Sequence, residues 1–113
     1  MPVDQENLNM LKEVIGDDLK EIIHAFLTTS PEILGQVKLS IEIEDAAGVQ
    51  LHSHTLKGSA ANIGAIHLPG LCAELETKAK EGVVTPEFNQ MYADIEAESQ
   101  AVFNFLQEFL QSF

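Results

Sequence analysis

The segment from Pro86 to Phe113, PEFNQMYADIEAESQAVFNFLQEFLQSF, decides the fold class of this chain. Apolar side chains recur in it at a spacing of about 3.5 residues. They are Phe88, Tyr92, Ile95, Val102, Leu106, Phe109 and Phe113. That spacing keeps one stripe of a long helix turned toward its neighbours, as in the helices of a bundle. The segment therefore predicts a long helix packed against other helices.

Glycine and proline residues divide the rest of the chain into helical lengths. The expected helices cover residues 4–14, 18–45, 46–63, 65–81 and 86–113. The second is expected to be kinked near Pro31, and two separate helices also fit its pattern. Pro69 is tolerated in a first turn, so the fourth helix proper should begin near Leu68. Because no segment alternates long enough to indicate a strand, we predict an all-α fold, an up-and-down antiparallel four-helix bundle with a short N-terminal lid helix.

Composition and charge narrow the class of protein. The chain has 113 residues and a formal charge of −12, from 6 Lys, no Arg and 18 acidic residues. Such a surface cannot neutralise a row of phosphates, which argues against a nucleic-acid binder. The length predicts a single domain over residues 1–113. No apolar run approaches the roughly 18 residues of a membrane span, and the N-terminal MPVDQENLNM has no signal-peptide pattern, so no membrane insertion is expected.

The expected third helix carries two histidines that face opposite ways. At about 100° per residue, His54 lies about 160° from Leu56, which marks the apolar stripe, whereas His52 lies some 40° from it. Lys57 and Gly58 follow His54 by three and four residues and share its outward stripe. His54 is therefore expected to be an exposed imidazole flanked by one cation and by a residue with no side chain.

This combination suits the transfer of a phosphoryl group. A neutral imidazole is a competent nucleophile near neutral pH, and a lysine one turn away can meet the negative charge of a phosphoryl group. A glycine in mid-helix costs about 1 kcal/mol relative to alanine, so Gly58 indicates a role beyond folding, such as the close approach of another protein. On an arbitrary helix, however, an exposed histidine beside a lysine is more often a plain surface feature.

The string HTLKGSAANIG, from His54 to Gly64, resembles the signature of histidine-containing phosphotransfer (HPt) domains, the intermediate carriers of phosphorelays. The resemblance implies an all-helical bundle over essentially the whole chain. It also implies that His54 accepts a phosphoryl group from a receiver-domain aspartate and passes it to another receiver aspartate. In the same way, Lys57 becomes the residue that stabilises the phosphoryl oxygens, and Gly58 the one that keeps the approach clear.

Two further residues are candidates for supporting roles. Family members commonly have Gln, hydrogen-bonded to the imidazole, where Glu76 falls in this chain. A carboxylate there would fix the imidazole tautomer and raise the basicity of the ring, but it would also repel incoming phosphate. Lys80 follows Glu76 by one turn and would lend electrostatic support, together with Lys57 and Lys78, if the third and fourth helices are antiparallel neighbours. Lys78 and Lys80 fit equally well as last-turn cations favoured by the helix dipole.

The resemblance also implies the partners. Receiver domains of response regulators or of hybrid sensor kinases would exchange phosphoryl groups with the chain, and Mg²⁺ would belong to the receiver, so the chain needs no cofactor of its own. No phosphate-cradling Gly-x-x-x-x-Gly-Lys motif is present, and we expect a phosphocarrier and not a kinase. A monomer is expected. The single Cys72 cannot form an internal disulfide, which indicates either a reducing compartment or a chain that is indifferent to redox state, and a cytoplasmic location is expected by default.

Two other functions fit the same sequence. A bundle of the same descent could serve only as a docking module, with His54 idle. The four histidines suggest a metal-binding bundle as a further alternative; they are His24, His52, His54 and His67. Ligand pairs on one helix need spacings of three or four, whereas His52 and His54 are two apart, which makes the metal-binding bundle the weaker alternative.

Overall fold

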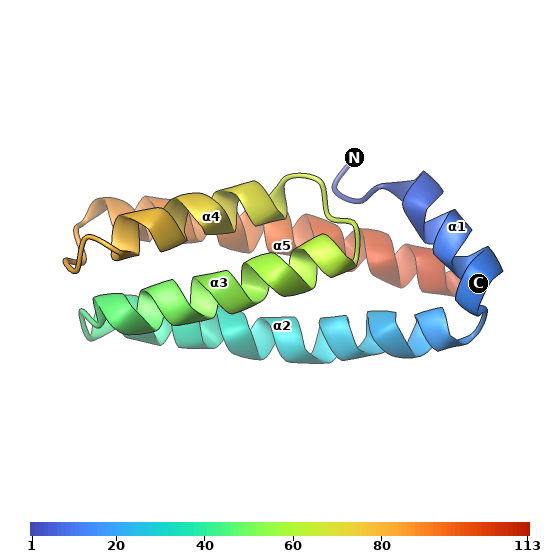
Figure 1. The fold of residues 1–113 in the computed structure, drawn as a ribbon, viewed down its shortest axis with the longest axis horizontal. Helices are drawn as coiled ribbons and strands as arrows, with labels where there is room; N and C mark the ends of the chain where they lie inside the picture. The colour runs from blue at the N-terminus through green and yellow to red at the C-terminus, as the bar shows by residue number, and fades with distance from the viewer.

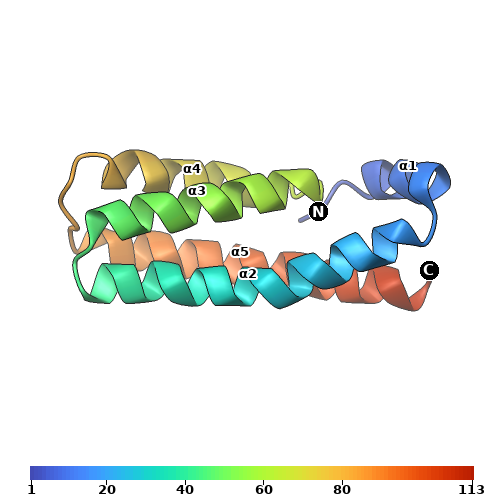
Figure 2. The ribbon, with the colours of Figure 1, turned by 60° about the horizontal axis from the view of Figure 1, so that its bottom comes forward.

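Five α-helices make up most of the chain in the computed structural model, which describes residues 1–113. They are α1 (Gln5–Ile15), α2 (Asp18–Glu42), α3 (Ala46–Asn62), α4 (Leu68–Ala79) and α5 (Glu87–Gln111). The helices α2 to α5 run side by side and alternate in direction, and α1 lies at the end where α2 begins and α5 finishes (Figure 1, Figure 2). The predicted all-α bundle with a short N-terminal helix is confirmed.

Side-chain caps account for the starts of α1 and α3. The Asp4 carboxylate accepts a hydrogen bond from the backbone N–H of Asn7 at 3.2 Å, and Asp45 accepts one from the N–H of Gly48 at 3.0 Å. Each bond satisfies a first-turn N–H that has no partner within its own helix. The two caps thus place the beginnings of α1 and α3 within a residue of where the sequence predicts them.

The helix α2 continues through Pro31 as one helix and not two. Pro31 has no backbone N–H, so the helical hydrogen bond to the carbonyl of Leu27 is missing. The helix bends near its middle, as Figure 2 shows, and the expected kink is therefore present. Phe26 before Pro31 and Leu34 after it are both buried, because the bend keeps the apolar stripe on the core.

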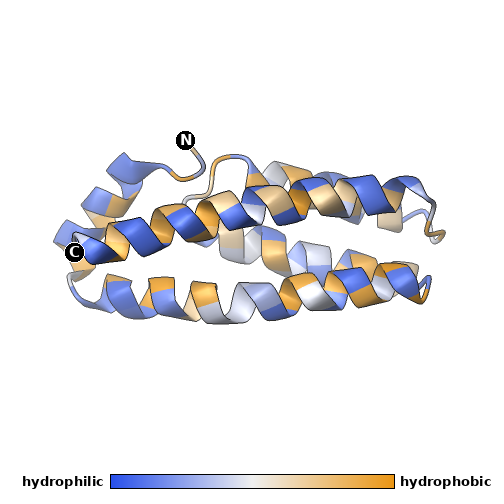
Figure 3. Cartoon of the chain, turned by 180° about the vertical axis from the view of Figure 1, so that it is seen from behind, coloured by the Kyte–Doolittle hydropathy of each residue, from blue (hydrophilic) through white to orange (hydrophobic).

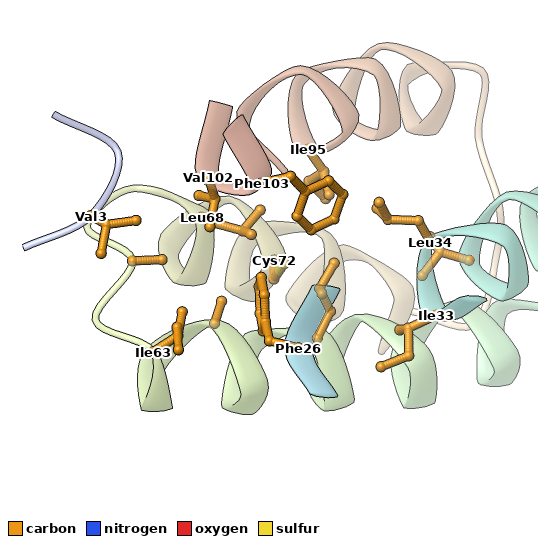
Figure 4. Packing of buried hydrophobic residues seen from close by; sticks show 14 of the residues in the cluster. Val3, Phe26, Ile33, Leu34, Ile63, Leu68, Cys72, Ile95, Val102 and Phe103 are labelled. Carbon is orange, nitrogen blue, oxygen red and sulfur yellow. The ribbon is translucent and has the colours of Figure 1, made fainter. Parts of the chain in front are cut away.

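All five helices contribute to one core of 24 buried apolar residues. In its middle, the rings of Phe26 on α2 and Phe103 on α5 meet edge to face, with their centroids 5.9 Å apart. Cys72 of α4 lies near this pair (Figure 4). The contact joins two helices that are far apart in the sequence and packs α2 against α5.

The predicted seam of α5 is buried over most of its length. The buried members are Phe88, Ile95, Val102, Leu106 and Phe109. Tyr92 and Phe113 are half-buried, and Ser99 occupies the seam between Ile95 and Val102. Hydrophobic and hydrophilic residues alternate along α5 in step with the helical turn (Figure 3). No helix combines the length and the apolar composition that crossing a bilayer requires.

The segment before α1 fastens the turn between α3 and α4. Val3 is fully buried and forms an isolated antiparallel bridge with Ala65. The N–H of Asp4 donates to the carbonyl of Gly64 at 2.9 Å. Gly64 adopts a φ of +82°, which favours glycine, and Asn7 of α1 packs against its bare α-carbon. These contacts fix the path from α3 into α4, and with it the side of α4 that meets α3.

Candidate functional site

His54 lies on the outward face of α3, where α4 passes alongside. Its side chain is 64% exposed, whereas the Glu76 side chain that reaches it from α4 is only 9% exposed. Nδ1 of the imidazole lies 2.9 Å from Oε2 of Glu76, which is hydrogen-bond distance. The hydrogen bond uses one ring nitrogen only, so the other, Nε2, is left free on an exposed ring.

Lys57 binds the second oxygen of the same carboxylate. Its Nζ lies 2.6 Å from Oε1 of Glu76. Because Lys57 follows His54 by three residues, both side chains can reach toward α4 from one side of α3. A buried carboxylate is costly unless its oxygens are bonded, and here each oxygen has a partner. The three side chains form a continuous chain of contacts, which we call the His54–Glu76–Lys57 triad.

The triad holds Glu76 in its ionised form. The hydrogen bond from Lys57 lowers the pKa of the Glu76 carboxyl below its ordinary value, and the bond with His54 lowers it further. Burial of the carboxyl raises the pKa, but by less than these bonds lower it. An ionised carboxylate can only accept hydrogen bonds, so the proton between Glu76 and His54 belongs to Nδ1. In the neutral ring, Nε2 then carries the lone pair and faces outward.

The rest of the surface around His54 is bare. A Cβ atom placed on Gly58 would have no neighbour within 4 Å, so the packing of this chain does not require glycine there. Leu51 and Thr55, one turn before and one residue after His54, are also exposed. Next to Gly58, Ser59 lines a groove of about 200 Å³ between α2 and α3. Nothing in the chain therefore covers His54 on this surface.

The three lysines expected near the site do not all belong to it. Lys57 contacts Glu76, but Lys78 turns to the other neighbour of α4, with its Nζ 3.2 Å from Oε1 of Glu87 on α5. Lys80 is the exposed C-cap residue of α4 and forms no ion pair. The expected grouping of Lys57, Lys78 and Lys80 was thus wrong for Lys78, because α4 packs against α5 as well as α3.

The other histidines differ from His54 in their surroundings. The side chains of His24, His52 and His67 form no hydrogen bond or ion pair. No three His, Cys, Asp or Glu side chains come together in a way that could hold a metal ion. Among the four histidines, only His54 is bonded to a carboxylate.

Comparison with known proteins then identifies the family. Residues 21–111, which include the whole triad and Gly58, match the family described as Hpt domain. The chain belongs to the Hpt domain family. It is accordingly a phosphocarrier and not a kinase, as predicted. Hpt proteins carry no cofactor, and they interact with receiver domains of two-component systems.

Solved Hpt proteins share the fold of this Hpt domain. Histidine-containing phosphotransfer protein B (HptB) from Pseudomonas aeruginosa is 27% identical, with a TM-score of 0.92, over 99% of this chain and 96% of that chain. The maize protein ZmHP2 has a TM-score of 0.86 at 22% identity, over 99% of this chain and 91% of its own, which shows the fold alone. The curated "Phosphorelay intermediate protein rdeA" of Dictyostelium discoideum is 27% identical over 89 residues, 79% of this chain. The Hpt domain spans only 35% of that relative's length.

Sequence reasoning missed the contact between Lys57 and Glu76. A signal for it was present, because Glu76 lies four residues after Cys72 and three before Ala79, both buried apolar positions, and so shares their side of α4. A carboxylate in such a position needs a cation or several donors. Lys57 is the cation that the bundle brings to it.

Proposed function

We propose that this Hpt domain relays phosphoryl groups from one receiver aspartate to another, with His54 as the phosphoacceptor. The observation that carries the proposal is the exposed His54 ring, whose Nδ1 is bonded to the buried Glu76 carboxylate. Nε2 attacks the phosphorus of an aspartyl phosphate in line; the N–P bond forms as the P–O bond breaks, and the electron pair leaves with the aspartate carboxylate. A second receiver aspartate later attacks the same phosphorus, and the ring leaves.

The neighbours of His54 take distinct roles in this scheme. Glu76 is a positioning residue, because its bond to Nδ1 fixes the tautomer and the direction of the ring. The Lys57 side chain is 33% exposed, which leaves its ammonium free to turn from Glu76 toward the phosphoryl oxygens. Gly58 leaves room for a receiver backbone. Lys80, at the end of α4, adds positive charge on the approach.

The receiver supplies what this chain lacks. Phosphoryl transfer is mostly positioning and charge stabilisation, and Mg²⁺ supplies much of the latter. We place that Mg²⁺ in the acidic pocket of the receiver, which docks on the bare surface formed by Leu51, Thr55 and Gly58. A monomer in the cytoplasm suits this role, and the buried, unpaired Cys72 agrees with a reducing compartment.

Transfer of labelled phosphate tests the proposal, with a matched control on the same helix. A receiver carrying radiolabelled aspartyl phosphate is mixed with wild type, with His54→Gln and with His52→Gln. His52 lies two residues from His54 and has no bonded partner, so its replacement controls for the loss of a histidine from α3. We expect acid-labile, base-stable label on wild type and on His52→Gln, and none on His54→Gln.

Two results would contradict the proposal. Label that persists in His54→Gln means that another residue accepts the phosphoryl group. If several receivers of proven activity transfer nothing to the wild type, the docking module with an idle His54 becomes the better account.

A further inference from the structure

We infer that the Glu76 carboxylate keeps the Nδ1 proton on His54 throughout the transfer cycle, so that phosphorylated His54 stays in its protonated, labile form at neutral pH. This inference rests on the proposed function of His54. It assigns Glu76 a role in setting how readily the phosphoryl group leaves, beyond orienting the ring.

The geometry supports a fixed proton acceptor. In the unphosphorylated protein, Oε2 of Glu76 lies 2.9 Å from Nδ1 and Oε1 lies 2.6 Å from Nζ of Lys57, so both oxygens have a partner, and the bond to Nδ1 does not depend on Lys57. The side chain is 9% exposed, which limits its rotation and keeps water from replacing it. An amide at this position could either accept from Nδ1–H or donate to a bare Nδ1, whereas a carboxylate can only accept. Glu76 therefore favours one protonation state of the ring, where an amide would tolerate both.

The protonation state of the ring decides how readily it leaves when the phosphoryl group moves on to the second aspartate. When the Nε2 lone pair forms the N–P bond, the ring still carries the Nδ1 proton and becomes a cation. If the proton were then lost to water, the ring would be neutral, and its departure in the next step would produce an imidazolide anion, a poor leaving group. If Glu76 holds the proton, the N–P electron pair returns to Nε2 and the ring departs as neutral imidazole. No proton then moves in either step.

The other charges around His54 are compatible with a protonated phosphoryl-bearing ring. Lys57, on the same helix, opposes a second positive charge, but it is paired with Glu76 and can turn to the phosphoryl group. Burial raises the pKa of the Cys72 thiol, one turn before Glu76 on α4, to about 12, so this group is neutral. Lys80 is exposed at the end of α4. No residue of α2 or α5 forms a hydrogen bond or ion pair with the triad.

The test compares the protonation and the lifetime of phosphorylated His54 in wild type, Glu76→Gln and Glu74→Gln. Glu74→Gln removes the same charge from an exposed position of the same helix and is the matched control. Each protein is phosphorylated with phosphoramidate, a small donor that needs no receiver. Nitrogen NMR of labelled histidine then reports whether Nδ1 carries a proton, and hydrolysis of the N–P bond is followed across the same pH series.

We expect the pH midpoint for loss of the Nδ1 proton to fall by about 1 to 3 pH units in Glu76→Gln, the usual effect of removing one adjacent opposite charge. At about pH 8, phosphohistidine in Glu76→Gln should then last about tenfold longer or more than in wild type and in Glu74→Gln. Equal midpoints and equal lifetimes in wild type and Glu76→Gln would overturn the inference.

A second measurement needs no variant. The Nδ1 midpoint of phosphorylated wild type is compared in the native state and in urea, where the triad is absent. A native midpoint that is not above the unfolded one also overturns the inference. Neither of these two contradicting results affects the proposed function, provided that the label is on His54. Failure of wild type to take label on His54 instead removes the proposed function itself.

Discussion

His52 and His54 lie two residues apart on α3, yet the helix turns them into different surroundings. His54 is an exposed ring with one nitrogen bonded to a buried carboxylate, whereas His52 is half-buried and has no bonded partner. The two side chains are chemically identical, so any difference in reactivity comes from what faces them. The comparison shows that α4, by supplying Glu76, gives only one of two neighbouring imidazoles a bonded carboxylate, and we propose that this difference makes His54 the reactive one.

Filling the exposed surface at Gly58 should have the largest effect on phosphoryl transfer. Such a change keeps His54 and Glu76 in place but blocks the approach of a receiver domain. We expect Gly58→Leu to slow transfer from a phosphorylated receiver by about a hundredfold or more, since a misplacement of about 1 Å already costs about that much. Phosphorylation by phosphoramidate should change by less than about twofold, because a small donor needs little room. Rates of both reactions on the same preparation measure the contrast.

Gly35→Leu is the matched control for that experiment. Gly35 also lies exposed in mid-helix, on α2, and a Cβ atom placed on it would have no neighbour within 4 Å. Both replacements gain about 1 kcal/mol of helix propensity per residue, so stability should rise alike. Receiver transfer that is equally slow in Gly35→Leu, or unchanged in Gly58→Leu, would show that the surface around Gly58 is not where the receiver docks.

Removing one member of the triad should have a smaller effect. We expect Lys57→Ala to slow transfer by about 10- to 100-fold, because a charge-assisted hydrogen bond is worth about 1.5 to 3 kcal/mol. Lys78→Ala is the control, since Lys78 pairs with Glu87 on the far side of α4. Single-turnover transfer rates measure both. Equal rates for Lys57→Ala and wild type would exclude Lys57 from the phosphoryl site and leave it as a partner of Glu76 alone.

The smallest expected effect is on stability in acid. The pKa of Glu76 is lowered in the folded protein, so its ion pairs stabilise the fold above the unfolded value of about 4.3 and are lost as the pH falls below it. We expect wild type to exceed Glu76→Gln in unfolding free energy by about 1 kcal/mol at neutral pH, and the difference to shrink steadily as the pH falls below the unfolded pKa and through the lowered pKa of the folded state. Urea unfolding at several pH values checks this. A difference that persists or grows in acid would contradict it.

The fold could be predicted from the sequence because its signals are local. The seam of Phe88, Ile95 and Val102 requires only the helical repeat, and the kink at Pro31 requires only a missing N–H. His54 and Gly58 could be found for the same reason, because spacing along one helix places both on its outer surface.

The parts that could not be predicted depend on how α4 is rotated about its own axis. That rotation is set by contacts distant in sequence, such as the bridge between Val3 and Ala65 that fixes the α3–α4 turn. It decides that Glu76, whose contact with His54 the family resemblance implied, also reaches Lys57, and that Lys78 turns to α5 instead. Helical periodicity places these residues on a face, but it does not say which neighbouring helix that face meets.

The most direct test of the central claim identifies the nitrogen that carries phosphorus. The wild type, with isotope-labelled histidine, is phosphorylated by a receiver, and nitrogen–phosphorus coupling is measured by NMR. The account predicts coupling to Nε2 of His54 and none to His52, because Glu76 occupies Nδ1 of His54 and no carboxylate holds the ring of His52. Coupling to Nδ1 of His54, or to any other histidine, would contradict it.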